Sequence, residues 1–154
     1  MLHFYDMNYF YYVCATYPIY IAIVYAVVYV VMMHEKVHHV RHMVTIIGGA
    51  IVAYFMAVFL KGIIMHPRPD LTQALFIPND IYSFPSGHAT FMFTLAYSMY
   101  TLDKRGSWVL FFLACVTGIA RVISGVHYWY DIVGGIVLAY LITHVVVYSV
   151  KKFS

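Results

Sequence analysis

Residues 82–90 read Tyr-Ser-Phe-Pro-Ser-Gly-His-Ala-Thr and form a polar, turn-rich stretch inside a very apolar chain. Pro85 disfavours a helical backbone at the residue before it, and Ser86 can cap a helix that begins directly after it. Gly87 lets the backbone approach a ligand closely, and the free N–H groups at a helix start bind anions such as phosphate. His88 then lies in the first turn, with a side chain that can donate or accept a proton near neutral pH. This stretch therefore predicts a helix that begins at a phosphate-binding site.

The rest of the chain is apolar enough for an integral membrane protein. Of its 154 residues, 64% are hydrophobic and 10% are charged, with a mean hydropathy of +0.81, whereas soluble domains average about 25% charged residues. We expect an all-α, polytopic transmembrane helical bundle in which residues 1–154 form a single domain and Pro18 kinks the first span. The apolar spans, each near the ~20 residues that cross a bilayer, are about Phe10–Met33, Val44–Met65, Ser86–Leu102, Ser107–Ser124 and Tyr128–Val150.

The basic residues separate into two groups along these five spans. Those at alternate span ends, which mark the cytoplasmic face by the positive-inside rule, are Lys36, Arg41, Lys104, Arg105, Lys151 and Lys152. An odd number of spans then places the N-terminus outside and the C-terminus in the cytoplasm. Lys61, Arg68 and Arg121 fall at or near the opposite, outer face. Because a charge at mid-membrane costs ~2.5–3.5 kcal/mol on insertion scales, these three are candidates for a functional site.

The three outer cations are spaced so that they can meet. Lys61 and Arg68 are seven positions apart, which places them within about 20° of each other on a helix. Arg121 ends the fourth span, and Gly125 permits a turn between it and His127. A site with several cationic donors fits a highly charged anion, of which phosphate is the most obvious. The cations would stabilise charge on a transferring phosphoryl group, so that no metal or other cofactor is required.

Two histidines of the same face suit different roles in phosphoryl transfer. His127 and Asp131 stand at i and i+4, share a helix face, and can form a hydrogen bond between imidazole and carboxylate. This pairing favours His127 as a neutral, oriented nucleophile. His88 has no carboxylate beside it in the sequence, which favours it as the protonated acid that loads the leaving oxygen.

Together these residues resemble the three motifs of the type 2 phosphatidic acid phosphatase family. The matching segments are Lys61-x6-Arg68-Pro69, Pro85-Ser86-Gly87-His88 and Arg121-x5-His127-x3-Asp131, and the resemblance covers about Lys61 to Gly135. It implies metal-independent hydrolysis of lipid phosphates through a phosphohistidine intermediate. It also implies that His127 is the nucleophile, Asp131 its partner and His88 the acid. The residues that the resemblance assigns to phosphate binding are Lys61, Arg68, Ser86, Gly87 and Arg121.

The chain departs from the family pattern at two points. Ala120 stands where the family has serine, which removes one hydrogen bond and is expected to weaken positioning without abolishing activity. Membrane members commonly have six spans and five are expected here. The missing span would lie at the N-terminus, outside the motif-bearing helices.

The implied substrate is a lipid phosphate or pyrophosphate at the outer face of a bacterial inner membrane. Undecaprenyl pyrophosphate, phosphatidylglycerophosphate and lipid A 1-phosphate are candidates that the sequence does not rank. No basic arm or stripe suggests nucleic acid, and no obligate protein partner is evident. An alternative is a non-catalytic lipid-phosphate binder or transporter on the same fold, which needs the cations but not a nucleophilic His127. A soluble vanadate-type haloperoxidase relative shares the motif pattern, but the five spans argue against it.

A second histidine group lies at the expected cytoplasmic interface. His34, His38 and His42 repeat at i, i+4 and i+8, with Glu35 and His39 beside them. Histidine and carboxylate at this spacing can bind zinc or nickel. The alternative is an extension of the helix at the membrane interface that binds no metal.

Overall fold

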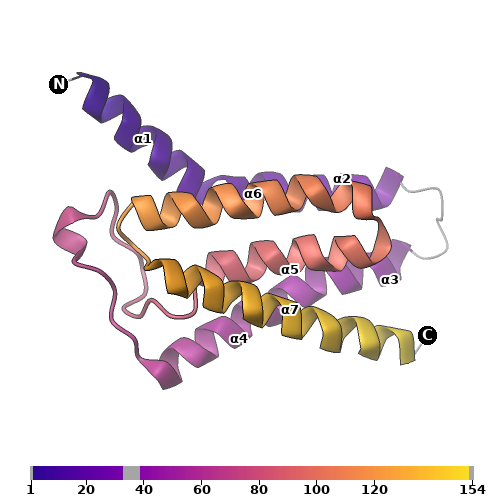
Figure 1. Cartoon of the computed structure of the whole chain (residues 1–154). Helices are drawn as coiled ribbons and strands as arrows, with labels where there is room; N and C mark the ends of the chain where they lie inside the picture. Colours follow the sequence, from indigo (N-terminus) through magenta and orange to yellow (C-terminus); the bar gives the residue numbers. More distant parts are fainter. Residues whose placement is uncertain (1, 33–38, 153–154) are drawn as a thin grey trace.

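The computed structural model describes residues 2–32 and 39–152, and these residues form helices and loops without a β-strand. One isolated β-bridge among them joins Pro67 and Tyr82. The all-α architecture predicted from the sequence is confirmed (Figure 1). The elements are α1 (Leu2–Thr16), α2 (Pro18–Met32), α3 (His39–Met43), the π-helical segment η2 (Val44–Gly48), α4 (Gly49–Ile64), the 3₁₀ turn η3 (Leu71–Gln73), α5 (Gly87–Leu102), α6 (Lys104–Ile123) and α7 (Trp129–Lys152).

The N-terminal segment, expected as one kinked span over Phe10–Met33, is a bent pair of helices. Its two parts, α1 and α2, differ in direction by 41°. The kink expected at Pro18 is confirmed, because proline has no N–H to donate to the preceding turn and its ring clashes with that turn. The last helical hydrogen bond before the bend runs from the Tyr17 N–H to the Val13 carbonyl oxygen, at 2.9 Å. As a result α1 packs on α6 and points away from the line of α2 (Figure 1).

Helix α5 lies at the centre of the bundle, in contact with α4, α6 and α7. Eleven of its sixteen residues are buried, so it is surrounded by protein on most sides. Two of its buried threonines bond to the helix backbone: Thr90 Oγ1 donates to the Ser86 carbonyl oxygen at 2.9 Å, and Thr94 Oγ1 donates to that of Thr90 at 2.7 Å. Buried polar groups are tolerated when they are hydrogen-bonded in this way. His88, in the first turn, is therefore held on a central and well-packed element.

Two glycines let the start of α7 lie against the start of α5. A Cβ on Gly135 would come within 3.0 Å of the Ser86 carbonyl oxygen, and one on Gly134 within 2.4 Å of the Phe84 ring. Only glycine allows backbones to approach so closely. The contact is reinforced by the Ser86 N–H, which donates to the backbone carbonyl oxygen of Asp131 at 3.0 Å. The second and third sequence motifs are thereby fixed side by side.

The exterior of the bundle has the apolar character of a membrane protein. Among the described residues, three helical segments are long and apolar enough to cross a bilayer: Val40–Ile64, Lys104–Ile123 and Trp129–Lys152, with the bent α1–α2 pair as a fourth if it counts as one span. Large apolar side chains such as Phe55, Phe59 and Val137 point outward and are more than half exposed. Such surface is stable against lipid rather than water. The chain is therefore a multi-pass membrane protein, in which α5, at sixteen residues, is shorter than a typical span.

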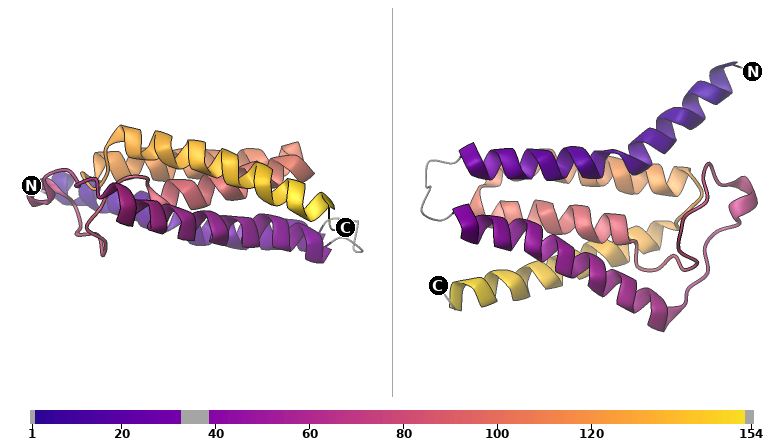
Figure 2. Two further views of the ribbon diagram at one scale, coloured as in Figure 1. Left: turned by 90° about the horizontal axis from the view of Figure 1, so that it is seen from below. Right: turned by 180° about the vertical axis from the view of Figure 1, so that it is seen from behind.

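The loops of the bundle are sorted to two ends. Figures 1 and 2 show the loop from α4 to α5 and the connection from α6 to α7 at one end, and the α5–α6 turn and the C-terminus at the other. Lys61, Arg68 and Arg121 belong to the first end, whereas Lys104 and Lys151 belong to the second. The separation of cations expected from the sequence is thus present in the fold, and the orientation of the two ends across the membrane stays a prediction.

Candidate active site

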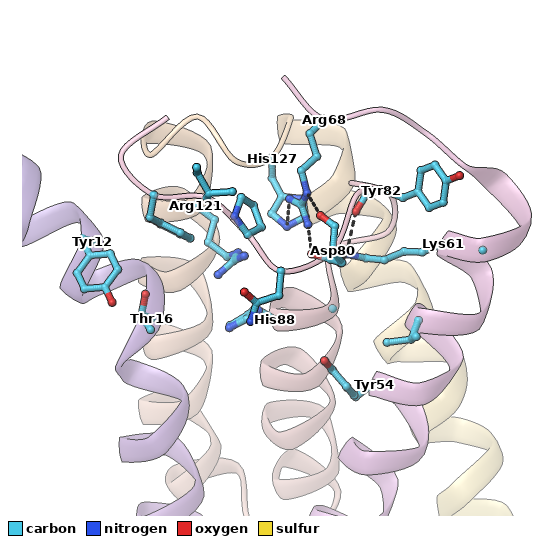
Figure 3. A pocket seen from close by; sticks show the side chains of 17 residues that line it. Tyr12, Thr16, Tyr54, Lys61, Arg68, Asp80, Tyr82, His88, Arg121 and His127 are labelled. Atoms are coloured by element: carbon cyan, nitrogen blue, oxygen red, sulfur yellow. Dashed lines mark hydrogen bonds and ion pairs between the residues drawn. The ribbon is translucent and has the colours of Figure 1, made fainter. Parts of the chain in front are cut away.

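A cavity of about 600 Å³ opens at the end of the bundle that holds the α4–α5 loop (Figure 3). Six of the residues predicted from the sequence line it: Lys61, Arg68, Gly87, His88, Arg121 and His127. The other two are set back from the cavity, since Asp131 is fully buried behind His127 and Ser86 is fully buried at the start of α5. The six predicted lining residues come from α4, the loop after it, α5, α6 and the connection from α6 to α7.

His127 is held between an acceptor and a donor. Its Nδ1 lies 3.1 Å from Oδ2 of Asp131, and the Tyr128 N–H donates to the same oxygen at 2.9 Å. An ionised carboxylate only accepts hydrogen bonds, so Nδ1 holds the proton. Nη1 of Arg68 lies 3.4 Å from Nε2 and can only donate, which requires a lone pair on Nε2. The two partners together favour the neutral tautomer, which carries its proton on Nδ1 and its lone pair on Nε2.

The His127–Asp131 pair forms at a helix N-terminus, and not along a helix face as the i, i+4 spacing suggested. His127 precedes α7, which begins at Trp129, and Asp131 lies in the first turn of that helix. Gly125, with a φ of +72°, reverses the chain after α6, as the sequence predicted. Asp131 thus caps the backbone N–H of Tyr128 and orients the imidazole with the same oxygen.

Lys61 and Arg68 meet through a shared carboxylate. Helix α4 ends at Ile64, so Arg68 lies in the following loop and does not share a helix face with Lys61. Oδ2 of Asp80 accepts from Lys61 Nζ, and Oδ1 accepts from Arg68 Nη2. The lysine also donates to the Tyr82 carbonyl oxygen at 3.1 Å, and Nε of Arg68 to the backbone carbonyl oxygen of Asp80 at 2.9 Å. Both cations are in the site as predicted, but an internal anion lies between them.

Arg121 reaches the cavity from the last turn of α6 without a carboxylate partner. Its Nη1 donates to the Ala15 carbonyl oxygen at 3.2 Å, and its guanidinium lies over the Phe76 ring, 5.7 Å from the centroid. Nε has no hydrogen-bond partner in the described part of the chain, although the residue is only 5% exposed. A buried guanidinium with a free donor can bind an anion that enters the cavity. Ala120 beside it is buried and has no side-chain hydrogen bond to offer.

The first turn of α5 supplies backbone donors. Oγ of Ser86 accepts from the Ala89 N–H at 3.4 Å, which confirms the predicted N-cap. The N–H groups of Gly87 and His88 belong to the first turn, which an α-helix leaves without internal partners. Both residues line the cavity, so these donors suit an anion there. Ser86 itself acts in this structure as the cap, and direct phosphate binding by its hydroxyl stays a prediction.

Residues 43–154 match the family model described as the PAP2 superfamily. The chain belongs to the PAP2 superfamily. The match covers all three motifs, and it confirms the resemblance to type 2 phosphatidic acid phosphatases that the sequence suggested.

Individual PAP2 relatives are similar over part of their length. "Bacitracin transport permease protein BcrC" of Bacillus licheniformis is 35% identical over 72 residues, which is 47% of this chain and 36% of the relative. "Undecaprenyl-diphosphatase BcrC" of Bacillus subtilis (strain 168) is 28% identical over 102 residues, 64% of this chain and 51% of the relative. The matched regions thus span about a third to a half of these curated relatives.

Two solved PAP2 structures share the fold. The transmembrane PAP2-type phosphatidylglycerolphosphate phosphatase of Bacillus subtilis aligns with a TM-score of 0.69 at 20% identity, over 96% of this chain and 78% of its own. LpxE of Aquifex aeolicus aligns with a TM-score of 0.70 at 21% identity, over 92% of this chain and 85% of its own. At this level of identity the alignments show a common helical architecture.

Three polar residues of the PAP2 site were not expected from the sequence: Asp80, Ser83 and His66. Ser83 is fully buried, and its hydroxyl donates to the Pro67 carbonyl oxygen at 2.9 Å. The same Oγ lies 3.0 Å from Nδ1 of His66 and 3.4 Å from Oδ1 of Asp131. Ser83 therefore joins the loop after α4 to the carboxylate that orients the His127 imidazole. Its position three residues before Ser86 was the available sequence signal.

The second histidine group lies largely outside the described residues. His34 and His38 fall in the undescribed segment, whereas His42 lies in α3 and is 5% exposed. Both interpretations of this group, a metal site and an interfacial helix extension, stay open.

The buried position of His127 determines the pH at which activity should be lost on the acidic side. Burial lowers the pKa of His127 to about 4; the hydrogen bond to Asp131 opposes this, and the charges of Arg121, Arg68 and Lys61 add to it. With a neutral His127 as the expected attacking group, kcat/KM should be lost as the pH falls through about 4. A histidine with the usual pKa of about 6.5 would instead lose activity near that pH. Initial rates from pH 3.5 to 8, with the folded fraction measured at each pH, test this, and an acidic limb near pH 6.5 would contradict it.

Proposed function

We propose that this PAP2 protein removes phosphate from a lipid phosphate or pyrophosphate. The observation that supports this most strongly is the state of His127, a neutral imidazole whose unprotonated Nε2 accepts from Arg68 in a cavity lined by three cations. The cavity also has apolar walls, with Tyr54 and Val58 of α4 on one side and Phe76 of the loop on another. A charged centre with apolar walls suits a ligand that combines a phosphate with a hydrocarbon chain.

The first chemical step transfers the phosphoryl group to the enzyme. Nε2 of His127 attacks phosphorus, and the bond from phosphorus to the leaving oxygen breaks. His88 gives its proton to that oxygen, and Asp131 stabilises the charge that develops on the His127 ring. Lys61, Arg68 and Arg121 stabilise the charge on the transferring group.

The second step releases phosphate. His88, now neutral, takes a proton from a water molecule whose oxygen attacks phosphorus. The bond between phosphorus and Nε2 breaks, inorganic phosphate leaves, and both histidines return to their starting protonation states. For a lipid pyrophosphate the product of the first step is the lipid monophosphate.

An isoprenoid pyrophosphate is the first substrate to test. The support is the sequence similarity to a relative named undecaprenyl-diphosphatase. Phosphatidylglycerophosphate and lipid A 1-phosphate follow, because the structural neighbours include a phosphatidylglycerolphosphate phosphatase and LpxE. We place the protein in a bacterial inner membrane with five spans, counting α5 and the bent pair, and with the cavity at the outer face. The N-terminus would then lie outside and the C-terminus in the cytoplasm.

A non-catalytic binder or transporter of lipid phosphates is the second candidate. One similar relative has a name that refers to transport. Its sequence identity to this chain, 35% over 72 residues, is higher than the 28% of the undecaprenyl-diphosphatase over 102 residues. Such a protein would need the cations of the cavity, but a nucleophilic histidine with an oriented partner would have no role in it.

The test is phosphate release by detergent-purified protein, with His127→Ala beside the wild type. The lipids are undecaprenyl pyrophosphate, phosphatidylglycerophosphate, lipid A 1-phosphate and phosphatidic acid. We expect the wild type alone to release phosphate and the panel to rank the substrates. A folded wild type that releases none from any lipid would favour the binder.

Activity should survive EDTA. Three protein cations already neutralise the phosphoryl group, so added chelator is expected to leave the initial rate unchanged within error. A Mg²⁺-dependent phosphatase assayed in the same detergent confirms that the chelator works. Loss of activity that Mg²⁺ restores would show that the cations are not sufficient.

A further inference from the structure

Among the described residues, Asp80 is the one carboxylate that lines the cavity. It lies in the loop before α5, and its two oxygens bind two different cations, Lys61 and Arg68 (Figure 3). The carboxylate is half exposed, whereas the two cationic side chains are 9% and 2% exposed. An anion with an oxygen on each of two buried cations has the geometry expected of a bound phosphoryl group.

The carboxylate is ionised and competes for positive charge. Burial alone would raise the pKa of Asp80, but hydrogen bonds and charges from Lys61 and Arg68 outweigh this and lower it. Asp131, the other carboxylate of the site, is fully buried behind His127 and does not face the cavity. With Asp80 in place, two of the three cations are occupied, and Arg121 alone is without an anionic partner.

The cations do not depend on this carboxylate for their positions. Lys61 also donates to the Tyr82 carbonyl oxygen at 3.1 Å. Arg68 donates from Nε to the backbone carbonyl oxygen of Asp80 at 2.9 Å, and from Nη1 to that of Val126. These backbone acceptors remain when the carboxylate turns away, so both cations would stay directed at the cavity.

We propose that the Asp80 carboxylate occupies the phosphate position between Lys61 and Arg68 in the ligand-free protein and is displaced when an anionic substrate binds. This inference rests on the proposed function, since it concerns the same phosphate site. Because the Asp80 carboxylate must first be displaced, every anion that takes this position binds more weakly by the same factor. Phosphodiester headgroups, with one negative charge, are abundant in bilayers and bind weakly, so the carboxylate keeps them out. A phosphomonoester or pyrophosphate, with more charge, still binds.

The experiment compares Asp80→Asn with the wild type by isothermal titration of inorganic phosphate and of dimethyl phosphate at pH 8. Asparagine keeps the shape and removes the charge. We expect phosphate to bind roughly two- to thirtyfold more tightly to the variant, the range for loss of two competing, half-exposed ion pairs, and dimethyl phosphate to gain by a similar factor. Equal or weaker phosphate binding would overturn the proposal and make Asp80 a clamp that holds the cations for the ligand.

Asp70→Asn is the matched control. Asp70 lies in the same loop, accepts from the Thr72 N–H at 3.0 Å, and is fully exposed. Asparagine can keep that cap, so phosphate binding should match the wild type. Asp80→Ala, which keeps the backbone carbonyl that accepts from Arg68, serves as a second variant and must show the same direction as Asp80→Asn.

The two proposals fail separately in this design. The titrations need no turnover, so tighter binding by Asp80→Asn supports the displaced carboxylate even if no lipid is hydrolysed. If the wild type hydrolyses lipids but the Asp80 variants bind phosphate more weakly, the function stands and this inference falls.

Discussion

His127→Ala is expected to reduce phosphate release by roughly 10⁴-fold or more, since the proposed covalent intermediate forms on this imidazole. Inorganic phosphate should still bind, because Lys61, Arg68 and Arg121 stay in the cavity. Loss of turnover with retained binding is the pattern that separates a nucleophile from a binding residue. The measurements are initial rates on the best lipid of the panel and isothermal titration of phosphate.

The controls for His127 address folding and chemistry. Alanine leaves Asp131 buried without its imidazole partner, so His127→Asn is measured as well, because its amide can donate close to the place of Nδ1. His144→Asn alters an exposed histidine of α7, bonded to the Tyr140 carbonyl oxygen, and should retain full activity. Substantial turnover by folded His127→Ala would assign the nucleophile to another residue.

His88→Ala is expected to slow hydrolysis of a lipid monophosphate by roughly 10²- to 10⁴-fold, which is the usual contribution of a general acid. The loss should depend on the leaving group. An alkoxide needs the proton that His88 supplies, whereas p-nitrophenolate leaves readily without one. With p-nitrophenyl phosphate the step that forms the phosphohistidine should therefore be nearly unaffected, and a pre-steady-state burst of p-nitrophenol should remain.

The burst distinguishes the acid role of His88 from a role in binding. If the variant lost the p-nitrophenol burst and also lost phosphate binding, His88 would be a phosphate ligand rather than the acid. His144→Asn again provides the control for replacing a histidine elsewhere in the fold.

The sequence predicted the site to the extent that its residues belong to local patterns. Ser86 caps α5 and Gly125 turns the chain after α6, as residue type and position indicated. The bounds expected for α5 and α7 agree closely with the structure, because apolar runs flanked by turn residues report helix ends directly. Six of the predicted residues line one cavity.

Predictions that assumed an unbroken helix were less accurate. Lys61 and Arg68 do not share a helix face, since α4 ends between them, and His127 precedes α7. In each case the residues still meet, but they do so through loops whose path depends on packing.

By itself, the sequence determined that the chain is a helical membrane protein and which residue types are available for phosphate chemistry. Apolar runs must be buried or face lipid, and cations beside them need a partner, so both facts follow from composition and spacing. Only the tertiary structure decided the partners. It placed the Asp80 carboxylate between Lys61 and Arg68, and Arg68 against Nε2 of His127. The spacing of residues along a helix reports neighbours within one or two turns, whereas contacts between segments distant in sequence depend on how the whole bundle packs.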